Sequence, residues 1–233
     1  MQPCCYGFGK NKFLYFFSTM YNIPYILIFT YVGCLNIYSI DASSNHDWDL
    51  LIFTQHWPLS VCLQWKEVLL NHTCSLPIKE LWTIHGIWPT KLGTRGPAFC
   101  NSSLHFNASA LSVIEPELRQ YWGDVHNESA QGTQLWKHEW KKHGTCAATL
   151  PALDTELKYF KQGLTWIKEY TMDNVLSKAG IQPNNNYTPE AVSQAVHKIL
   201  GKNPAIQCIE DNKNKQYYLF EIRICFDKNL TFD

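Results

Sequence analysis

The sequence predicts a single α+β domain that follows an apolar leader. Segments rich in β-branched and aromatic residues lie near both ends of the domain, at 48–57 and 216–226, and helix-like segments lie between them. A length of 233 residues with 45% hydrophobic content is enough to bury one core. The sequence contains no repeat, linker or low-complexity tract, so a second domain is not expected.

The first forty residues predict entry into the secretory pathway. Lys10 and Lys12 are their only charges, and the segment 13–40 is uncharged and rich in aromatic residues. This pattern is typical of a signal peptide, here with cleavage near 41–44. Because about 20 apolar residues can span a bilayer, an uncleaved signal anchor is the alternative. We therefore assign 1–42 to the leader and 43–233 to the domain, with membrane contact only if the leader is an uncleaved anchor.

Sequons and cysteines beyond the leader agree with this compartment. N-x-[ST] sequons occur at Asn71, Asn101, Asn107, Asn127, Asn186 and Asn229. Six cysteines allow up to three disulfides in an oxidising compartment: Cys62, Cys74, Cys100, Cys146, Cys208 and Cys225. Spacing alone does not determine how they pair.

The net charge of the domain depends on pH. The chain has 20 Lys+Arg against 20 Asp+Glu, and its nine histidines all lie beyond the leader. Protonation of histidines well below pH ~6.5 would make the domain positive. A polyanion would then bind better in an acidic compartment.

Two strands are predicted in the first part of the domain. The segment 48–57, WDLLIFTQHW, predicts a strand that enters the core. The segment 81–85, LWTIH, predicts a second strand that stops at Gly86 and Pro89. The stretch 91–109 is rich in glycine and polar residues and is expected to be mostly surface loop.

Two helices follow in the sequence. Thr133 is placed to cap a helix over 134–143, and Gly144 is placed as the residue that ends it. The segment 153–170 has apolar residues at helical spacing. Both segments therefore predict helices.

The C-terminal part predicts one more helix and two more strands. Thr188 and Pro189 are an N-cap and first-turn pair, and Gly201 closes the helix that they begin. The segments 205–210, AIQCIE, and 216–226, QYYLFEIRICF, are strand-like.

The stretch KHEWKKHGTC, at 137–146, concentrates side chains capable of catalysis. His138 and His143 are five apart, one more than in the zinc-protease pattern H-E-x-x-H, which at about 100° per residue separates them by roughly 140° on a helix. One zinc ion would not easily bind both, so no metal is expected. Glu139, Lys142 and His143 instead share one face, as i, i+3 and i+4, and could serve an anion or a proton transfer. An ordinary solvated helix end is the alternative.

A second histidine lies in TIHGIWP, at 83–89. His85 is expected at the end of a strand, where it could reach a cleft, and Trp88 offers a flat face for a base. Taken alone, a core histidine beside a packing tryptophan would be the simpler interpretation.

Together, WTIHGIWP at 82–89 and LWKHEWKKHGTC at 135–146 resemble the two active-site segments of the ribonuclease T2 family. This family of acid endoribonucleases includes plant self-incompatibility ribonucleases and secreted or lysosomal animal enzymes. The segment 53–62, with Gln55 and Cys62, is similar to the first strand of the animal branch. The resemblance covers the chain from 48 to its end. It implies helices packed on a central antiparallel sheet, and a secreted or lysosomal monomer without a cofactor.

The resemblance also implies the residue roles in a metal-free cleavage of single-stranded RNA. His143 would be the general base and His85 the general acid. Lys142 and Glu139 would stabilise the phosphorane, and His138 would hold the phosphate. The first product would end in a 2′,3′-cyclic phosphate, and DNA would not be cut because it lacks the 2′-hydroxyl. An acidic pH optimum is expected.

Base recognition and the cysteines follow from the same resemblance. Trp88 matches the stacking residue of the family, and Gln55 and Leu135 would contribute to a second base site. Thr90 stands where members often have aspartate, which leaves the base preference open. The implied disulfides are Cys62–Cys74 and Cys100–Cys146. Cys208 and Cys225 match positions whose partners lie further downstream, so in a chain shortened at its C-terminus they either pair together or keep free thiols.

Two other functions remain open at this point. A metallohydrolase would lose its activity in EDTA. A secreted glycoprotein that acts by binding or signalling, with weak or no catalysis, would keep its effect when both histidines are replaced.

Overall fold

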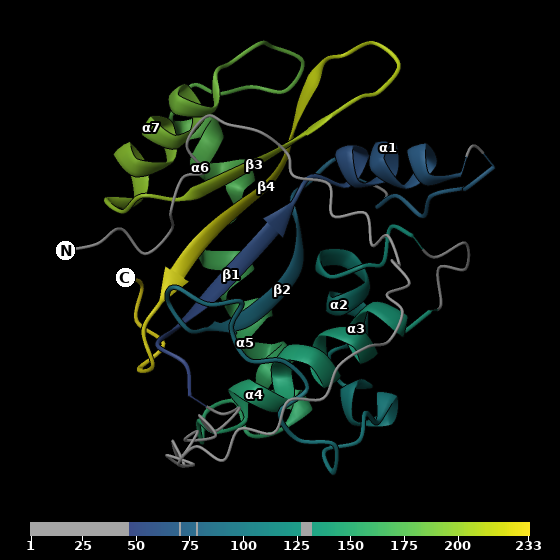
Figure 1. Cartoon of the computed structure of the whole chain (residues 1–233), viewed down its shortest axis with the longest axis vertical. Helices are drawn as coiled ribbons and strands as arrows, with labels where there is room; N and C mark the ends of the chain where they lie inside the picture. The colour runs from purple at the N-terminus through teal and green to yellow at the C-terminus, as the bar shows by residue number, and fades with distance from the viewer. Residues whose placement is uncertain (1–46, 70, 78, 127–131) are drawn as a thin grey trace, which may run out of the picture. The chain divides into compact units, whose positions relative to one another are not determined.

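The computed structural model describes residues 47–69, 71–77, 79–126 and 132–233 (Figure 1). The predicted leader, its boundary with the domain and the sequon at Asn127 lie outside these residues. Within the described ranges, no helix has both the length and the apolar character needed to cross a membrane.

A four-stranded antiparallel sheet is the centre of the fold (Figure 1). Its strands are β1 (Leu50–His56), β2 (Thr83–Thr90), β3 (Ala205–Glu210) and β4 (Tyr217–Phe226), in the order β2-β1-β4-β3. All neighbouring strands are antiparallel. The predicted α+β class with a central antiparallel sheet is confirmed, and β3 and β4 match the two strand-like segments of the sequence.

Helices pack around this sheet. They are α1 (Pro58–Val68), α2 (Glu115–Tyr121), α3 (Gln134–Glu139), α4 (Thr145–Ala147), α5 (Glu156–Glu169), α6 (Met172–Lys178) and α7 (Pro189–Leu200), with a 3-10 turn η1 (Ala108–Leu111) and a π-helical turn η2 (Trp140–Gly144). The sequence did not predict α1, α2 or α6. Helix α1 begins with Pro58 directly after β1, and this start signal was hidden by the strand-like segment before it.

Two helices have capping residues at their ends, of which the sequence predicts those of α7 but not that of α5. Thr188 accepts a hydrogen bond from the backbone N–H of Ala191 at 3.1 Å, and α7 ends at Gly201, whose φ of 76° is left-handed. At the start of α5, Thr155 caps the helix by accepting from the N–H of Lys158. Capping therefore determines both helices locally.

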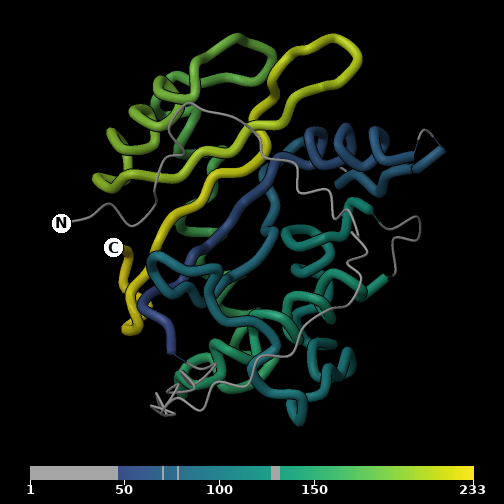
Figure 2. The backbone as a smooth tube through the Cα atoms, in the orientation of Figure 1, coloured from purple at the N-terminus to yellow at the C-terminus, as the bar shows by residue number. Residues whose placement is uncertain are grey.

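The two faces of the sheet differ in character. On one face, the Phe53 ring of β1 packs 5.5 Å from that of Trp166 on α5, and Trp166 stacks on Phe226 of β4 at 3.8 Å. Helix α5 covers this face and lies behind the strands in the view of Figure 2. The side chains that alternate with these along β1, Thr54 and His56, belong to the opposite face. Near His56 this second face is polar, and that part of it carries the candidate site.

Strand β2 is longer than predicted. The sequence predicts that it stops at Gly86, yet it continues through Pro89 to Thr90. Proline is tolerated because β2 is an edge strand, where the missing N–H need not pair. Gly86 does not make a turn. Glycine is needed there because a Cβ atom would collide with the side chains of Glu139 and Trp88.

The helix predicted to end at Gly144 also continues. Gly144 has φ −59° and ψ −40°, and the chain passes from α3 through η2 into α4 without a break. A Cβ atom on Gly144 would lie 2.3 Å from Cε3 of Trp140, so glycine is required by a close ring contact. Thr133 precedes α3 as predicted, but its side chain makes no cap hydrogen bond.

Candidate active site

A β-bulge in β2 brings His85 and Trp88 onto one face. The register between β1 and β2 shifts between Thr54 and Gln55, which leaves His85 as the extra residue of β2. Residues three apart on a regular strand point to opposite faces, and one extra residue restores them to the same face. The two rings accordingly meet with centroids 5.0 Å apart. His85 is thus within the strand, and the prediction that it ends the strand is wrong.

The π-helical turn η2 brings together side chains that a regular helix would separate. The ring centroids of His138 and His143 are 6.5 Å apart. The predicted separation of roughly 140° is wrong, because a π-helix bonds residue i to i+5 and so stacks positions five apart. Glu139 is buried, and His143 lies 5.4 Å from the Trp88 ring, so both side chains face β2.

Gly86 is where the two segments meet. Trp88 donates a hydrogen bond from Nε1 to Oε2 of Glu139 at 3.0 Å. A Cβ atom on Gly86 would lie 2.0 Å from that same oxygen and 2.3 Å from Nε1 of Trp88. Only glycine therefore allows the buried carboxylate to approach the strand this closely.

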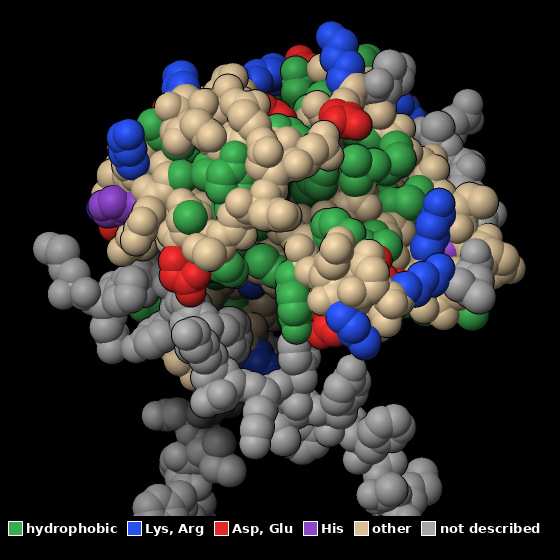
Figure 3. Space-filling model, turned by 90° about the horizontal axis from the view of Figure 1, so that it is seen from above, with side chains coloured by type: hydrophobic (Ala, Val, Ile, Leu, Met, Phe, Trp, Pro, Cys, Tyr) green, Lys and Arg blue, Asp and Glu red, His purple; other side chains and the backbone are tan. Residues whose placement is uncertain are grey.

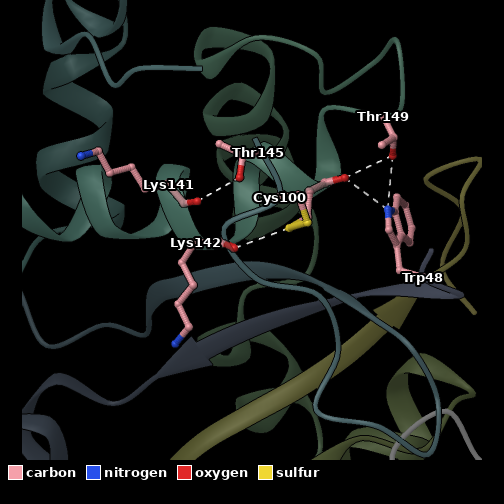
Figure 4. Close-up of a disulfide and its surroundings, with 7 residues drawn as sticks. Trp48, Cys100, Lys141, Lys142, Thr145 and Thr149 are labelled. Atoms are coloured by element: carbon pink, nitrogen blue, oxygen red, sulfur yellow. Dashed lines mark hydrogen bonds between the residues drawn. A yellow bond between two sulfur atoms is a disulfide. The ribbon is translucent and has the colours of Figure 1, made fainter. Parts of the chain in front are cut away.

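A disulfide holds the helical segment in place (Figure 4). Cys100 and Cys146 are bridged, and the backbone N–H of Phe99 donates to the carbonyl of Lys142 at 2.9 Å. Trp48 adds a hydrogen bond from Nε1 to the carbonyl of Cys146 at 3.2 Å. The Lys142 side chain points away from the disulfide, as Figure 4 shows. The loop after β2 and the end of the π-helical turn are thereby tied together.

The structure adds two residues of β4 and one of β1 that the sequence analysis missed. Nδ1 of His85 lies 2.5 Å from Oε1 of Glu221, whose side chain is 2% exposed. Arg223 donates to the other oxygen of Glu221. His56 stacks on His85 with centroids 5.3 Å apart. The alternation E-x-R in a strand-like segment signals a polar face, but only the strand order brings that face to His85.

The two predicted catalytic histidines have opposite pKa shifts. Burial alone would lower the pKa of His85, but the hydrogen bond and charge of Glu221 raise it above 6.5. Burial and the neighbouring positive charge of Lys142 lower the pKa of His143 to about 3. Nδ1 of His143 is buried without a hydrogen-bond partner among the described residues, which further disfavours the charged ring. One site therefore favours imidazolium and the other favours neutral imidazole.

The pKa values of Glu139 and His138 are also shifted. Burial raises the pKa of Glu139 to about 7, although the charge of His85 and the hydrogen bond from Trp88 oppose the shift. Burial and Lys142 lower the pKa of His138, which is exposed on α3. In an acidic solution the first of these would be a neutral hydrogen-bond donor.

The residues predicted to contact bases occupy different environments. Trp88 is partly exposed, and the guanidinium of Arg223 lies 5.2 Å from its ring centroid. Gln55 is fully buried, and its amide bonds the Tyr170 carbonyl and the Met172 N–H. Its role in a base site stays a prediction. Its polarity serves the turn between α5 and α6. Two other positions remain without a tested role: Leu135 is partly buried against the core, and the Thr90 hydroxyl donates to the Trp88 carbonyl.

Two groups of side chains have distances that a metal ion could bridge. The ligand atoms of His138, Glu139 and His143 all lie within 4.8 Å of one another, and so do those of His56, His85 and Glu221. The helical geometry that argued against a shared metal is thus absent. A metal-free reaction remains a prediction.

The remaining cysteines divide into two kinds. Cys62 and Cys74 form the second implied disulfide. Cys208 of β3 pairs in register with Leu219, and Cys225 lies six residues further along β4, roughly 20 Å away at about 3.3 Å per residue. Bridged Cα atoms lie about 4.4–6.8 Å apart, so a bond between these two is excluded. Cys208 keeps a free thiol, whereas Cys225 is buried.

A cavity of about 920 Å³ lies away from these residues, between the α6–α7 connection and the β3–β4 hairpin. Trp57, Trp82, Tyr187 and Cys208 line it, and none of the five predicted catalytic residues does. Figure 3 views the end at which α7 and the hairpin lie in Figure 1, and shows hydrophobic side chains gathered on that surface. The catalytic side chains lie instead on the polar part of the second face of the sheet.

Comparisons with known proteins agree with the geometry. A family model described as Ribonuclease T2 family matches residues 48–232. Ribonuclease T2-A of Mus musculus is 40% identical over 188 residues, which cover 80% of this chain and 68% of the relative. Ribonuclease T2 of Homo sapiens is 38% identical over 186 residues, covering 79% of this chain and 68% of the relative.

Two solved structures share the fold. The crystal structure of RNase NT in complex with 5′-AMP has a TM-score of 0.69 and 29% identity, covering 80% of this chain and 89% of that one. The crystal structure of human RNase T2 has a TM-score of 0.66 and 32% identity, with the same coverage of 80% and 89%.

Proposed function

The chain belongs to the ribonuclease T2 family and is an endoribonuclease, and from this premise we propose that it cleaves single-stranded RNA by transphosphorylation. The 2′-hydroxyl attacks the adjacent phosphorus, the bond from phosphorus to the 5′-oxygen breaks, and one product ends in a 2′,3′-cyclic phosphate. The observation that carries the proposal is the pair His85 and His143, which both contact Trp88 and have opposite pKa shifts.

The opposite shifts support an assignment of acid and base. His143, held neutral, accepts the proton of the 2′-hydroxyl. His85, held as imidazolium, gives a proton to the departing 5′-oxygen. Groups of one type whose surroundings push their pKa values apart are the pattern expected of an acid and base pair.

Three further side chains bind the phosphate and stabilise its negative charge. Lys142 supplies positive charge on the same turn as His143. Glu139, with a pKa of about 7, is protonated in acid and donates a hydrogen bond to a phosphoryl oxygen. His138 binds the phosphate from the exposed side of α3. RNase NT is described in complex with 5′-AMP, and we extend nucleotide binding beside Trp88 to this chain.

The pKa shifts also support an acidic optimum. Both histidines are in their working protonation states between the pKa of His143, about 3, and that of His85, which lies above 6.5. A bell-shaped profile bounded by these two groups has most of its width in acid.

The secretory pathway is proposed as the location. Five sequon asparagines fall within the described residues and all are exposed: Asn71, Asn101, Asn107, Asn186 and Asn229. The two disulfides also suit an oxidising compartment. We therefore propose a secreted or lysosomal glycoprotein, and an unchanged mass after N-glycosidase treatment of the secreted chain would contradict it.

The decisive experiment is digestion of single-stranded RNA at pH 5 in EDTA, followed by identification of the product ends. We expect cleavage that is unaffected by EDTA and yields 2′,3′-cyclic phosphates. An oligonucleotide with 2′-deoxyribose at one position is the matched control and should resist cleavage at that position only. Activity lost in EDTA and restored by zinc would contradict the metal-free reaction.

A further inference from the structure

Glu221 is a buried carboxylate with both oxygens engaged. Oε1 lies 2.5 Å from Nδ1 of His85, and Oε2 accepts hydrogen bonds from Nε and Nη2 of Arg223 at 3.1 and 2.6 Å. Burial alone would raise the pKa of Glu221, but His85 and Arg223 together lower it to about 2. The carboxylate is therefore charged throughout the working pH range and is compensated on both sides.

Arg223 fixes this carboxylate from the side away from His85. Its guanidinium also donates to Oε1 of Gln207 on β3 and lies over the Trp88 ring. A bonded fork of this kind limits where the carboxylate can move. The direction in which Glu221 meets the histidine ring is thereby set by the sheet.

We propose that Glu221 is a positioning residue for His85, holding Nδ1–H toward its carboxylate and leaving Nε2 for the 5′-oxygen of the substrate. It also keeps the ring charged until the proton is transferred. The inference rests on the proposed function, in which His85 is the general acid. Glu221 acts through His85 and contacts no reacting atom.

Charged and titratable groups face His85 from every side of its surroundings: His56 on β1, Glu221 and Arg223 on β4, His138, Glu139 and His143 on α3 and η2, and His126 after α2. Burial and the charge of His85 lower the pKa of His56 to about 3, so that ring stays neutral. Glu139 adds negative charge only when it is ionised, above a pKa of about 7, and Arg223 opposes the charge on His85. Glu221 alone combines a hydrogen bond to Nδ1 with negative charge, and this combination favours imidazolium.

Glu221→Gln in the full chain tests the proposal, because it keeps the size and an acceptor oxygen but removes the charge. We expect the basic limb of the kcat/KM profile to move to lower pH. Cleavage at pH 7 should fall about tenfold or more, since one pKa unit is a factor of ten. Cleavage at pH 5 should fall less than cleavage at pH 7, because a larger fraction of His85 is protonated at the lower pH.

The His85 ring titration, followed by NMR and assigned with His85→Ala, measures the same effect without RNA. We expect a lower midpoint in Glu221→Gln. If the unchanged protein cuts no RNA, the proposed function fails, while a lowered midpoint still supports the coupling of Glu221 to His85. An unchanged midpoint overturns the inference, whatever the activity.

Two further variants complete the test. Arg223→Gln removes an opposing charge and keeps an amide N–H that can donate to Oε2 of Glu221, so the midpoint should rise. A fall or no change would overturn the inference even if Glu221→Gln does not fold. Glu210→Gln removes a carboxylate from the neighbouring strand, where it accepts from Tyr217, and is the matched control. It should leave the titration of His85 unchanged.

Discussion

His85 and His143 are the same side chain in two opposite surroundings. His85 lies on a strand bulge against a buried carboxylate that is itself held by an arginine. His143 lies on a π-helical turn beside Lys142, with a buried ring nitrogen that has no partner among the described residues. The first surroundings stabilise the charged ring and the second the neutral ring. The chemical role of a histidine is therefore determined by what packs around it.

Both surroundings depend on an irregularity of secondary structure. The bulge turns His85 and Trp88 to one face of β2. The π-helical turn brings His138 over His143. Such features persist because they direct side chains that a regular element would point elsewhere.

Replacing the two histidines separately should give the largest effect. We expect His85→Ala and His143→Ala each to slow RNA cleavage by about 10²–10⁴-fold, the usual contribution of a general acid or base. The two variants should differ in rate on a nucleoside 3′-(4-nitrophenyl phosphate), because its leaving group departs without needing a proton. His85→Ala should then approach the unchanged rate, whereas His143→Ala should stay impaired. Equal impairment with this substrate would remove the assignment, and recovery of His143→Ala instead of His85→Ala would reverse it.

Gly86→Ala should give the next largest effect, by forcing the two segments apart. The new Cβ atom would lie 2.0 Å from Oε2 of Glu139, so the carboxylate and Trp88 must move. We expect cleavage to fall about 10–100-fold, since a displacement near 1 Å is enough for such a loss, and Tm to fall as well.

Gly180→Ala is the matched control for this change. Gly180 has φ +81° with nothing within 4 Å of the added Cβ atom, so alanine strains the backbone away from the site. It should lower Tm but preserve cleavage below the unfolding temperature. Full activity in Gly86→Ala would show that the contact between β2 and Glu139 is unnecessary.

The parts of the fold that the sequence predicted are those with local signals. Helix α7 has its cap at Thr188 and its stop at Gly201, and β4 has an alternating apolar pattern. The bulge and the π-helical turn were missed because pattern analysis assumes one period along each element. The sequence pattern predicts that Gly86 and Gly144 are stop signals, yet both make room for a neighbouring side chain. A glycine alone does not distinguish these two causes.

The sequence predicts the motif residues of the site, but it does not predict the residues that surround them. His85, Glu139 and His143 stand in recognisable segments of the sequence. Glu221 and His56 reach His85 only through the strand order β2-β1-β4 and the register that pairs His56 with Glu221. Long-range pairing of this kind has no signal in the local sequence. The pKa shifts that separate acid from base therefore required the fold.

The smallest expected effect concerns stability, where the histidines should again act in opposite directions. A histidine whose pKa is lowered on folding binds protons better when unfolded, so His56 and His143 cost stability as the pH falls from 6.5 toward about 3. His85, whose pKa is raised, contributes stability that is fully present below 6.5 and is lost as the pH rises through its folded value. For the fully buried His56, the cost at pH 5 is about 2 kcal/mol. Urea unfolding at pH 7 and pH 5 should therefore show a smaller loss in His56→Asn than in the unchanged chain. The exposed His197→Asn should not reduce the loss. An equal loss in all three proteins would mean that His56 is protonated in the folded state, and the neutral ring beside His85 would have to be abandoned.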